Sequence, residues 1–272
     1  MPITSDYHLH SSFSGDSKTP MEDMILHAIE LGLKSICFTE HMDFDYPITP
    51  TTPKDYFTIN TDSYLYELIK MKEKYTKQIS VLFGIELGLQ PHLAKENAKY
   101  IKEYDFDFVI ASSHLCNRED VYLSSFYEGK SDNEAYREYF ESILENIRKF
   151  TNFDVYGHLD YVVRYGRNKD NDYFYEDYSD VFEAILKLLI DKEKGIEINT
   201  GGIKKDLKEL HPATKIIKRY RELGGEIITV GSDSHTCSDM CQGFDWAAEV
   251  LKECGFRYYA VFEKRVASFM PL

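Results

Sequence analysis

Most of the histidines in this chain stand at or just beyond the ends of segments that are typical of β-strands. They are His8, His10, His41, His114, His158 and His235. The stretches before them are short and rich in β-branched or aromatic residues, as in 36–39, 108–111 and 227–230, and Glu86 and Asp233 follow segments of the same kind. In a barrel of parallel strands all the C-terminal ends open on one face, so these side chains would converge there. Because histidine and carboxylate are metal ligands, the pattern predicts a metal site in a parallel α/β barrel.

Strands and helices alternate along the whole chain. Amphipathic or apolar segments predict helices over about 20–31, 61–77, 93–103, 136–150, 180–194, 212–223 and 244–254. Each of these helices follows a predicted strand, and a last strand is expected over 257–262. Seven strand and helix pairs with a final strand predict one irregular barrel related to the (β/α)8 type.

Three connections are longer than barrel loops usually are. They cover 42–60, 115–132 and 159–179. Each follows a predicted strand, so each lies on the face that carries the histidines, where loops commonly contact substrates. The first contains three prolines that hold it extended, and it is a candidate lid over that face.

Composition narrows the classes of protein that fit this barrel. The chain has 272 residues, of which 43% are hydrophobic, and this suits a single domain with one sizeable core. The net charge is -14 and the chain has no block of lysines or arginines, so a nucleic-acid partner is not expected. It also has no apolar run of about 18 residues and no basic leader segment. Five scattered cysteines suit a reducing compartment, so we expect a cytoplasmic protein with no membrane partner.

A single histidine is more often a core or surface residue than a ligand, but six of nine at strand ends favours the metal interpretation. The other three, His27, His92 and His211, are interpreted as structural or solvated. Cys237 and Cys241 lie close to His235 in the sequence and suggest a thiolate zinc site. A spacing of four without a second cysteine pair gives that alternative little support.

The segments around the candidate ligands form a set with a characteristic order. They are His8-Leu9-His10, Thr39-Glu40-His41, Gly84-Ile85-Glu86, Ser112-Ser113-His114, Gly157-His158-Leu159-Asp160 and Gly231-Ser232-Asp233-Ser234-His235. This set resembles the motifs of the PHP (polymerase and histidinol phosphatase) family over nearly the whole chain. Segments 13–17, 157–161 and 197–202 are similar to its histidinol-phosphate phosphatase branch. The resemblance implies a distorted (β/α)7 TIM-like barrel of the PHP type, with residues 1–272 as a single PHP phosphoesterase domain.

The resemblance also implies a trinuclear metal centre of divalent zinc, manganese or iron at the C-terminal ends of the strands. The nine implied ligands form three groups, of which the first two share Glu86: His8, His10, Glu86 and Asp233; Glu86, His114 and His158; Asp16, His41 and His235. Many members of the family have histidine where Asp16 stands, although aspartate is familiar in the histidinol phosphatase branch. An oxygen ligand at that position would retune the third site.

The activity implied is that of a histidinol-phosphatase, a phosphoric monoester hydrolase that converts L-histidinol phosphate to L-histidinol and phosphate in histidine biosynthesis. The nucleophile would be a hydroxide that bridges the first two ions. The phosphate also needs cationic partners, and Arg164 and Lys204 are the best placed, with Arg118 a weaker candidate. No residue is assigned as the acid for the leaving group.

The implied substrate also has an imidazole and an amine, which need partners of their own. Phe13, Phe44 and Tyr161 are candidate aromatic contacts for them.

Two other classes of function share the predicted ligands. A phosphoesterase of this family can act on another small phosphate ester or on nucleic acid, but a nuclease needs an extended basic groove, which a net charge of -14 disfavours. A noncatalytic metal-binding or scaffold protein is the third class. All nine ligand types are present in the chain, and this argues against a degenerate module.

Overall fold

The computed structural model describes residues 2–205 and 207–272. Seven strands form its central sheet: β1 (Ser5–Leu9), β2 (Ser35–Met42), β3 (Ser80–Gly88), β4 (Phe108–Ser112), β7 (Val155–Tyr156), β8 (Gly195–Asn199) and β9 (Ile228–Gly231). The main helices are α1 (Met21–Glu30), α2 (Thr61–Tyr75), α3 (Ala94–Glu103), α4 (Asp132–Lys149), α5 (Ser179–Asp191), α6 (Thr214–Glu222) and α7 (Phe244–Glu253). These elements lie close to the predicted ranges, with helix ends shifted by a few residues.

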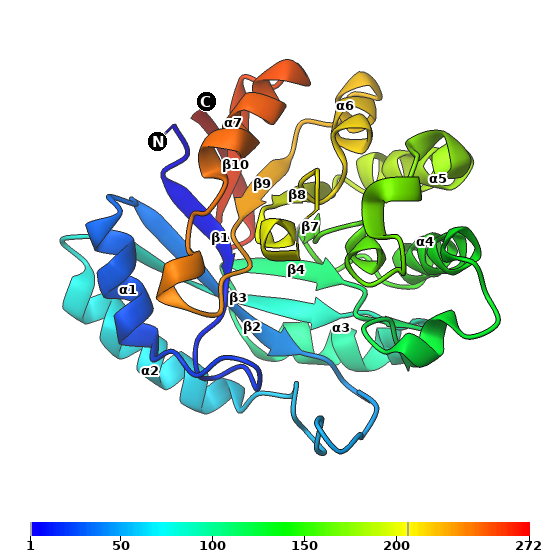
Figure 1. The fold of residues 1–272 in the computed structure, drawn as a ribbon. Coiled ribbons are helices and arrows are strands. Elements are labelled where there is room, and N and C mark those ends of the chain that lie inside the picture. Colours follow the sequence, from blue (N-terminus) through cyan, green and yellow to red (C-terminus); the bar gives the residue numbers. More distant parts are fainter. Residues whose placement is uncertain (1, 206) are drawn as a thin grey trace.

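The strands form a parallel sheet in the order β1-β2-β3-β4-β7-β8-β9, with the helices on its outer side (Figure 1). The two outer strands meet near their C-terminal ends, where Leu9 and Ser234 form an isolated parallel bridge. There the N–H of His10 donates to the carbonyl of Ser234 at 2.9 Å, and the N–H of Asp233 donates to the carbonyl of His8 at 2.8 Å. The result is a nearly closed seven-stranded barrel, which confirms the fold that the family resemblance implied.

The last predicted strand forms but does not join the barrel. β10 (Tyr258–Glu263) pairs antiparallel with β11 (Val266–Pro271) in a separate two-stranded sheet. Its Phe262 is buried against Phe108, with ring centroids 5.0 Å apart, and the hydroxyl of Tyr7 donates to the carbonyl of Phe262 at 2.9 Å. The seven strands therefore leave an apolar opening at their N-terminal side, and the hairpin fills it.

Local signals in the sequence account for several helix ends. The side chain of Asn60 accepts a hydrogen bond from Ser63 and caps α2. Ser131 and Glu134 form a reciprocal capping box at the start of α4. Gly32, with φ of 80°, follows the end of α1, where a left-handed conformation favours glycine.

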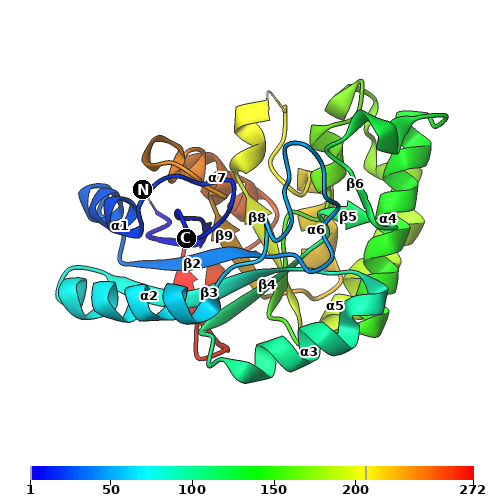
Figure 2. The ribbon, with the colours of Figure 1, turned by 90° about the horizontal axis from the view of Figure 1, so that it is seen from below.

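The loop between β2 and α2 extends beyond the end of β2 (Figure 2). Within this loop, Tyr46 and Phe57 lie in contact, with ring centroids 4.6 Å apart. The two chain termini lie close together in both views (Figures 1 and 2). In the part of the chain that the structure describes, every helix is too short or too polar to cross a membrane.

Candidate metal centre

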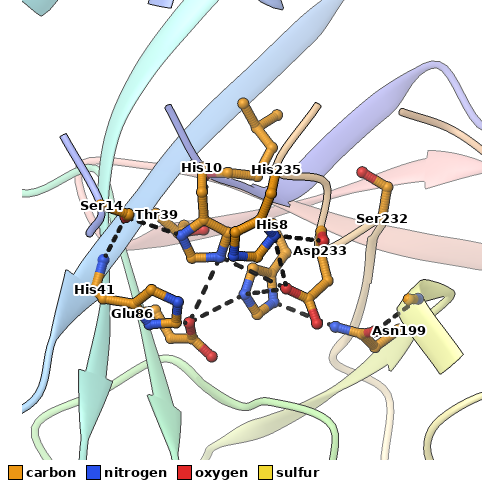
Figure 3. A network of polar contacts seen from close by, with 12 residues as sticks. His8, His10, Ser14, Thr39, His41, Glu86, Asn199, Ser232, Asp233 and His235 are labelled. Carbon is orange, nitrogen blue, oxygen red and sulfur yellow. Dashed lines mark hydrogen bonds and ion pairs between the residues drawn. The ribbon is translucent and has the colours of Figure 1, made fainter. Parts of the chain in front are cut away.

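The structure brings the predicted ligands together at the C-terminal ends of the strands, and Figure 3 shows most of them converging. One detail differs from the prediction. Glu86 and His41 do not follow their strands but lie within them, because parallel pairing continues through His41 opposite Glu86 and on to Gly88. Glu86 ends the apolar run in the sequence, whereas the backbone pairing of β3 continues for two more residues, to Gly88.

Glu86 is the centre of the arrangement, and its side chain is fully buried. Its Oε1 lies 2.9 Å from Nε2 of His158 and 3.2 Å from Nε2 of His114. Its Oε2 lies 3.3 Å from Nε2 of His8 and 3.6 Å from Nε2 of His10. Nδ1 of His41 lies closer still to Oε2, at 3.0 Å, so the two carboxylate oxygens face two different sets of histidines, as a residue shared between two cations would require.

Asp233 completes the group around His8 and His10. Its Oδ1 lies 3.8 Å from Nε2 of His8 and 3.6 Å from Nε2 of His10. Asp233 has a positive φ of 52°, and its backbone N–H donates to the carbonyl of His8. Backbone pairing across the barrel seam therefore fixes this aspartate beside the first strand.

The third predicted group lies at the outer edge of the centre. Oδ2 of Asp16 is 3.0 Å from Nε2 of His235 and 3.5 Å from Nε2 of His41. The rings of His41 and His235 each stack on His10 at a centroid distance of 4.3 Å. The Asp16 side chain is 33% exposed, whereas that of Glu86 is 0% exposed, so this group is the most accessible of the three.

Several polar atoms that face this centre are buried and have no hydrogen-bond partner among the described residues. They are Nε2 of His8, Nε2 of His10, Nδ1 of His41 and Oε2 of Glu86. Leaving such an atom unpaired costs about 1–3 kcal/mol, which a bound cation would offset. Four overlapping groups of three side chains have ligand atoms within 4.8 Å of one another. The donor set therefore fits divalent metal ions.

The charges around the centre suit cations. Burial raises the pKa of Glu86 and Asp233, but the neighbouring histidines outweigh burial and hold both pKa values well below their usual range. Burial lowers the pKa of His10 to about 3, with the nearby charges of His235 and His41 acting in the same direction. At neutral pH the carboxylates are ionised and His10 is neutral, so its Nε2 lone pair can bind a metal.

Three buried carboxylates behind the ligands were not predicted. Oε1 of Glu197 lies 2.7 Å from Nδ1 of His8, and Oδ1 of Asp43 lies 2.8 Å from Nδ1 of His114. Oε2 of Glu40 accepts a hydrogen bond from the hydroxyl of Ser14 at 2.6 Å, and this hydroxyl is 3.2 Å from Nδ1 of His10. Such partners orient metal-binding histidines and set which ring nitrogen carries the proton. The sequence feature that could have revealed these carboxylates is a single acidic residue in or beside an apolar strand, as at Glu197.

The centre lines a cavity of about 280 Å³ that also contains cationic side chains. Arg164 is buried there, and its two terminal nitrogens donate to Oδ2 of Asp233 at 3.1 Å and to Oδ1 of Asn199 at 3.0 Å. Lys204 also lines the cavity, with its Nζ 2.9 Å from Oδ2 of Asp239. Lys205, which was not predicted, is part of the same wall.

Arg118 lies elsewhere. Its side chain is 64% exposed, is 3.8 Å from Asp45 and does not line the cavity. The chain reverses direction immediately before it at Asn117 (φ 51°), and Arg118 itself has a φ of 70°. The structure thus brings Arg164 and Lys204 to the cavity and leaves Arg118 outside it.

Aromatic side chains form the rest of the cavity wall. They are Tyr46, Phe57, Tyr161 and Tyr165. The guanidinium of Arg164 lies 4.9 Å from the centre of the Tyr161 ring. Of the aromatic contacts expected from the sequence, only Tyr161 lies in this wall. Phe13 and Phe44 do not line the cavity, and they pack against Tyr64 and Tyr100 instead.

The three remaining histidines lie outside the centre, in agreement with their interpretation from the sequence. His27 and His92 are partly exposed beside Glu30 and Asp45, and His211 is buried beside Asp160. Cys237 and Cys241 are free thiols, and neither belongs to a metal-binding group within residues 2–205 and 207–272.

Comparisons with known proteins agree with this geometry. The PHP domain family model matches residues 6–201. The chain is 35% identical to the probable histidinol-phosphatase of Clostridium acetobutylicum, over 97% of this chain and 98% of that protein. It is also 35% identical to the histidinol-phosphatase of Lactococcus lactis, over 94% of this chain and 93% of that protein.

A crystal structure of the Lactococcus lactis histidinol phosphate phosphatase, complexed with zinc, L-histidinol and phosphate, superimposes with a TM-score of 0.88. The two chains share 33% identity, and the match covers 97% of this chain and 98% of that one. The family match over most of the barrel and the likeness along nearly the full length lead to one assignment. This chain belongs to the PHP domain family and, within that family, to the histidinol-phosphatase branch.

Proposed function

We propose that this chain is a metal-dependent histidinol-phosphatase that hydrolyses L-histidinol phosphate to L-histidinol and phosphate in histidine biosynthesis. The observation that carries the proposal is the metal-fitting centre beside buried Arg164 in one cavity of about 280 Å³. Similarity along nearly the full length to a phosphatase solved with zinc, L-histidinol and phosphate supports the same substrate. A cytoplasmic location stays a prediction, and the five free thiols are consistent with it.

The proposal treats residues 1–272 as a single phosphoesterase domain. Two contacts support this. The seam between β1 and β9 joins the beginning of the chain to its last quarter, and the β10–β11 hairpin packs into the N-terminal opening of the barrel. Strand β1 and the C-terminal hairpin therefore both pack into the barrel that carries the metal centre.

Nine residues are proposed to hold three divalent ions of zinc, manganese or iron. The groups are His8, His10, Glu86 and Asp233; Glu86, His114 and His158; Asp16, His41 and His235. When bound, such ions stabilise negative charge on phosphoryl oxygens and lower the pKa of bound water. The orphaned ligand atoms around Glu86 support the two inner sites.

The chain's own side chains would bind and orient the ester. Arg164 is held by Asp233 and Asn199, and its buried Nε has no partner among the described residues. A fixed guanidinium of this kind suits a charge-assisted contact with a phosphate oxygen. Lys204 and Lys205 add positive charge to the same wall. The tyrosines and Phe57 exclude water from the bound ester and offer faces to an imidazole or ammonium group.

The test of function is a substrate panel on metal-loaded protein. Histidinol phosphate, sugar phosphates, nucleoside phosphates and a single-stranded oligonucleotide would be compared by kcat/KM. We expect histidinol phosphate to be preferred by at least about tenfold, a discrimination of roughly 1.4 kcal/mol. Equal rates across the monoesters would contradict the substrate assignment. Cleavage of the oligonucleotide as the main activity would favour the nuclease alternative.

Metal content is expected to be two to three transition ions per chain, since nine ligand residues make ten contacts when Glu86 counts twice. Elemental analysis after metal loading and removal of free ions measures this number. A content at or below one ion per chain with activity intact would rule out the trinuclear centre.

Asp16→Ala is expected to leave measurable activity, because the residues around Glu86 remain in place and Asp16 lies at the exposed edge. Hydrolysis of an alkyl phosphate should fall more than that of an aryl phosphate, because a poor leaving group depends more on charge stabilisation. Asp23→Ala, a change at an exposed aspartate on α1, is the matched control. An equal fall for both esters, with one ion lost, would contradict this role of the outer group.

A further inference from the structure

The motif at residues 197–202 carries two buried polar side chains that are not among the proposed metal ligands or phosphate contacts. Glu197 and Asn199 lie on β8, two residues apart, so both point to the same side of the strand. Glu197 is 1% exposed and Asn199 is 0% exposed, and neither lines the cavity. Asn199 lies on the side of His8 and Asp233 (Figure 3), and Glu197 contacts the ring of His8.

Glu197 accepts hydrogen bonds from three groups. Its Oε1 lies 2.7 Å from Nδ1 of His8, and its Oε2 accepts from the backbone N–H of His158 at 3.0 Å and from Nδ2 of Asn199 at 3.1 Å. Because a carboxylate only accepts, Nδ1 of His8 carries the proton and Nε2 is left as the metal-facing lone pair. One carboxylate therefore orients a ligand on β1 and the backbone of a second ligand after β7.

The surrounding backbone is adapted to this carboxylate. A Cβ atom on Gly231 would overlap Oε1 of Glu197 and the side chain of His8. A Cβ atom on Gly157 would lie 3.3 Å from Oε2 of Glu197 and even closer to Ser112. Glycine at the end of β9 and directly after β7 thus leaves room for a charged group in the barrel interior, where an apolar residue would be the ordinary choice.

Asn199 connects Glu197, which contacts a proposed metal ligand, with Arg164, which is proposed to bind phosphate. Its Nδ2 donates to Glu197, and its Oδ1 accepts from Nη2 of Arg164 at 3.0 Å and from the N–H of Gly201 at 2.9 Å. The other terminal nitrogen of Arg164 donates to Asp233. These partners fix the amide in one orientation, with its donor toward the carboxylate and its acceptor toward the guanidinium.

We propose that Glu197 and Asn199 are a positioning pair in which Glu197 orients His8 for metal binding and Asn199 orients Arg164 for phosphate binding. The inference rests on the ligand and phosphate roles proposed above. It assigns a separate task to each of two neighbouring residues on one strand, so each half predicts its own measurable change.

The first half is tested by Glu197→Gln. Glutamine has one acceptor oxygen for three donors, so its NH2 group would face another donor, and His8 would lose a charged partner. Zinc affinity, measured by competition with a chelator, is expected to weaken about 10- to 100-fold. This readout does not depend on the substrate, so it stands apart from the substrate panel.

Asp154→Asn is the matched control. Asp154 is a buried carboxylate at the start of β7, where it accepts from the N–H of Val109 at 2.8 Å and pairs with Arg265. The control should lower thermal stability and leave zinc affinity unchanged. Zinc affinity at the wild-type level in folded Glu197→Gln, or an equal loss in Asp154→Asn, would overturn the role of Glu197.

The second half is tested by Asn199→Ala, which removes no charge. Binding of inorganic phosphate to the zinc-loaded protein, followed by calorimetry, is expected to weaken about tenfold, while zinc content stays unchanged. Because Asn199 is proposed to act through Arg164, adding Asn199→Ala to Arg164→Ala should cause no further loss. Additive losses in the double variant, or wild-type phosphate affinity in Asn199→Ala, would overturn the role of Asn199.

Discussion

Glu86→Gln is expected to lower kcat by at least about 1000-fold, because metal-ion catalysis contributes several kcal/mol and each 1.4 kcal/mol is a factor of ten. The change keeps the size of the side chain but removes the charge of the carboxylate. Its Oε1 faces His158 and His114, and its Oε2 faces His8, His10 and His41. Since Glu86 is proposed to be shared between the two inner groups, both would lose a ligand at once. Steady-state kinetics on metal-loaded protein measures the effect.

Metal analysis should accompany the kinetics of Glu86→Gln, and the expected content is lower than in the wild-type protein. Glu249→Gln, on the exposed surface of α7, is the matched control and should behave as wild type. His114→Ala removes a ligand from one inner group and is also expected to nearly abolish turnover. More than a tenth of wild-type kcat in folded Glu86→Gln would rule out its place at the centre of the chemistry.

Arg164→Ala is expected to lower kcat/KM about 10- to 1000-fold, which corresponds to the loss of a charge-assisted contact of roughly 1.5–4 kcal/mol. Arg164 is the buried cation of the cavity wall and is already oriented by Asp233 and Asn199. A guanidinium fixed in this way loses little further freedom when it binds phosphate. Kinetics with histidinol phosphate and metal analysis of the same sample measure the effect.

Metal content should not change in Arg164→Ala, because every proposed ligand remains. Lys204→Ala is the comparison, and its loss should be smaller, because Lys204 is paired with Asp239 and its side chain is 27% exposed. Wild-type kinetics in Arg164→Ala would return Arg164 to a purely structural role. A loss of metal equal to the loss of activity would show that its main task is to hold Asp233.

The barrel and eight of the nine candidate ligands were readable from local patterns in the sequence, whereas Asp16 was implied only by the family resemblance. Apolar runs of strand length and amphipathic helices alternate, and the ends of parallel strands must lie on one face. His8 and His10 illustrate this, since alternation along a strand sends both side chains to the same side. The grouping of ligands needed the family resemblance, because spacing in the sequence does not say which strands face each other across a barrel.

Other features depended on contacts between distant segments. The sequence predicted a strand at 257–262, which forms as β10, but not its partner, which is β11 rather than a barrel strand. Arg118 was predicted as a phosphate contact and Lys205 was not, yet of these two cations Lys205 is the one that lines the cavity. The path of a loop depends on many weak contacts. The position of a long side chain in the sequence therefore does not predict where its charged group lies in the structure.

The sequence alone therefore determined the fold class and the kinds of chemistry at the strand ends, since both follow from local periodicity and residue type. Only the tertiary structure decided which buried partners stand behind the ligands. Glu197 reaches His8 across 189 positions of the chain, and Asn199 meets Arg164 across 35. A carboxylate in an apolar strand is costly unless it is paired, and its partners become visible only when the barrel closes.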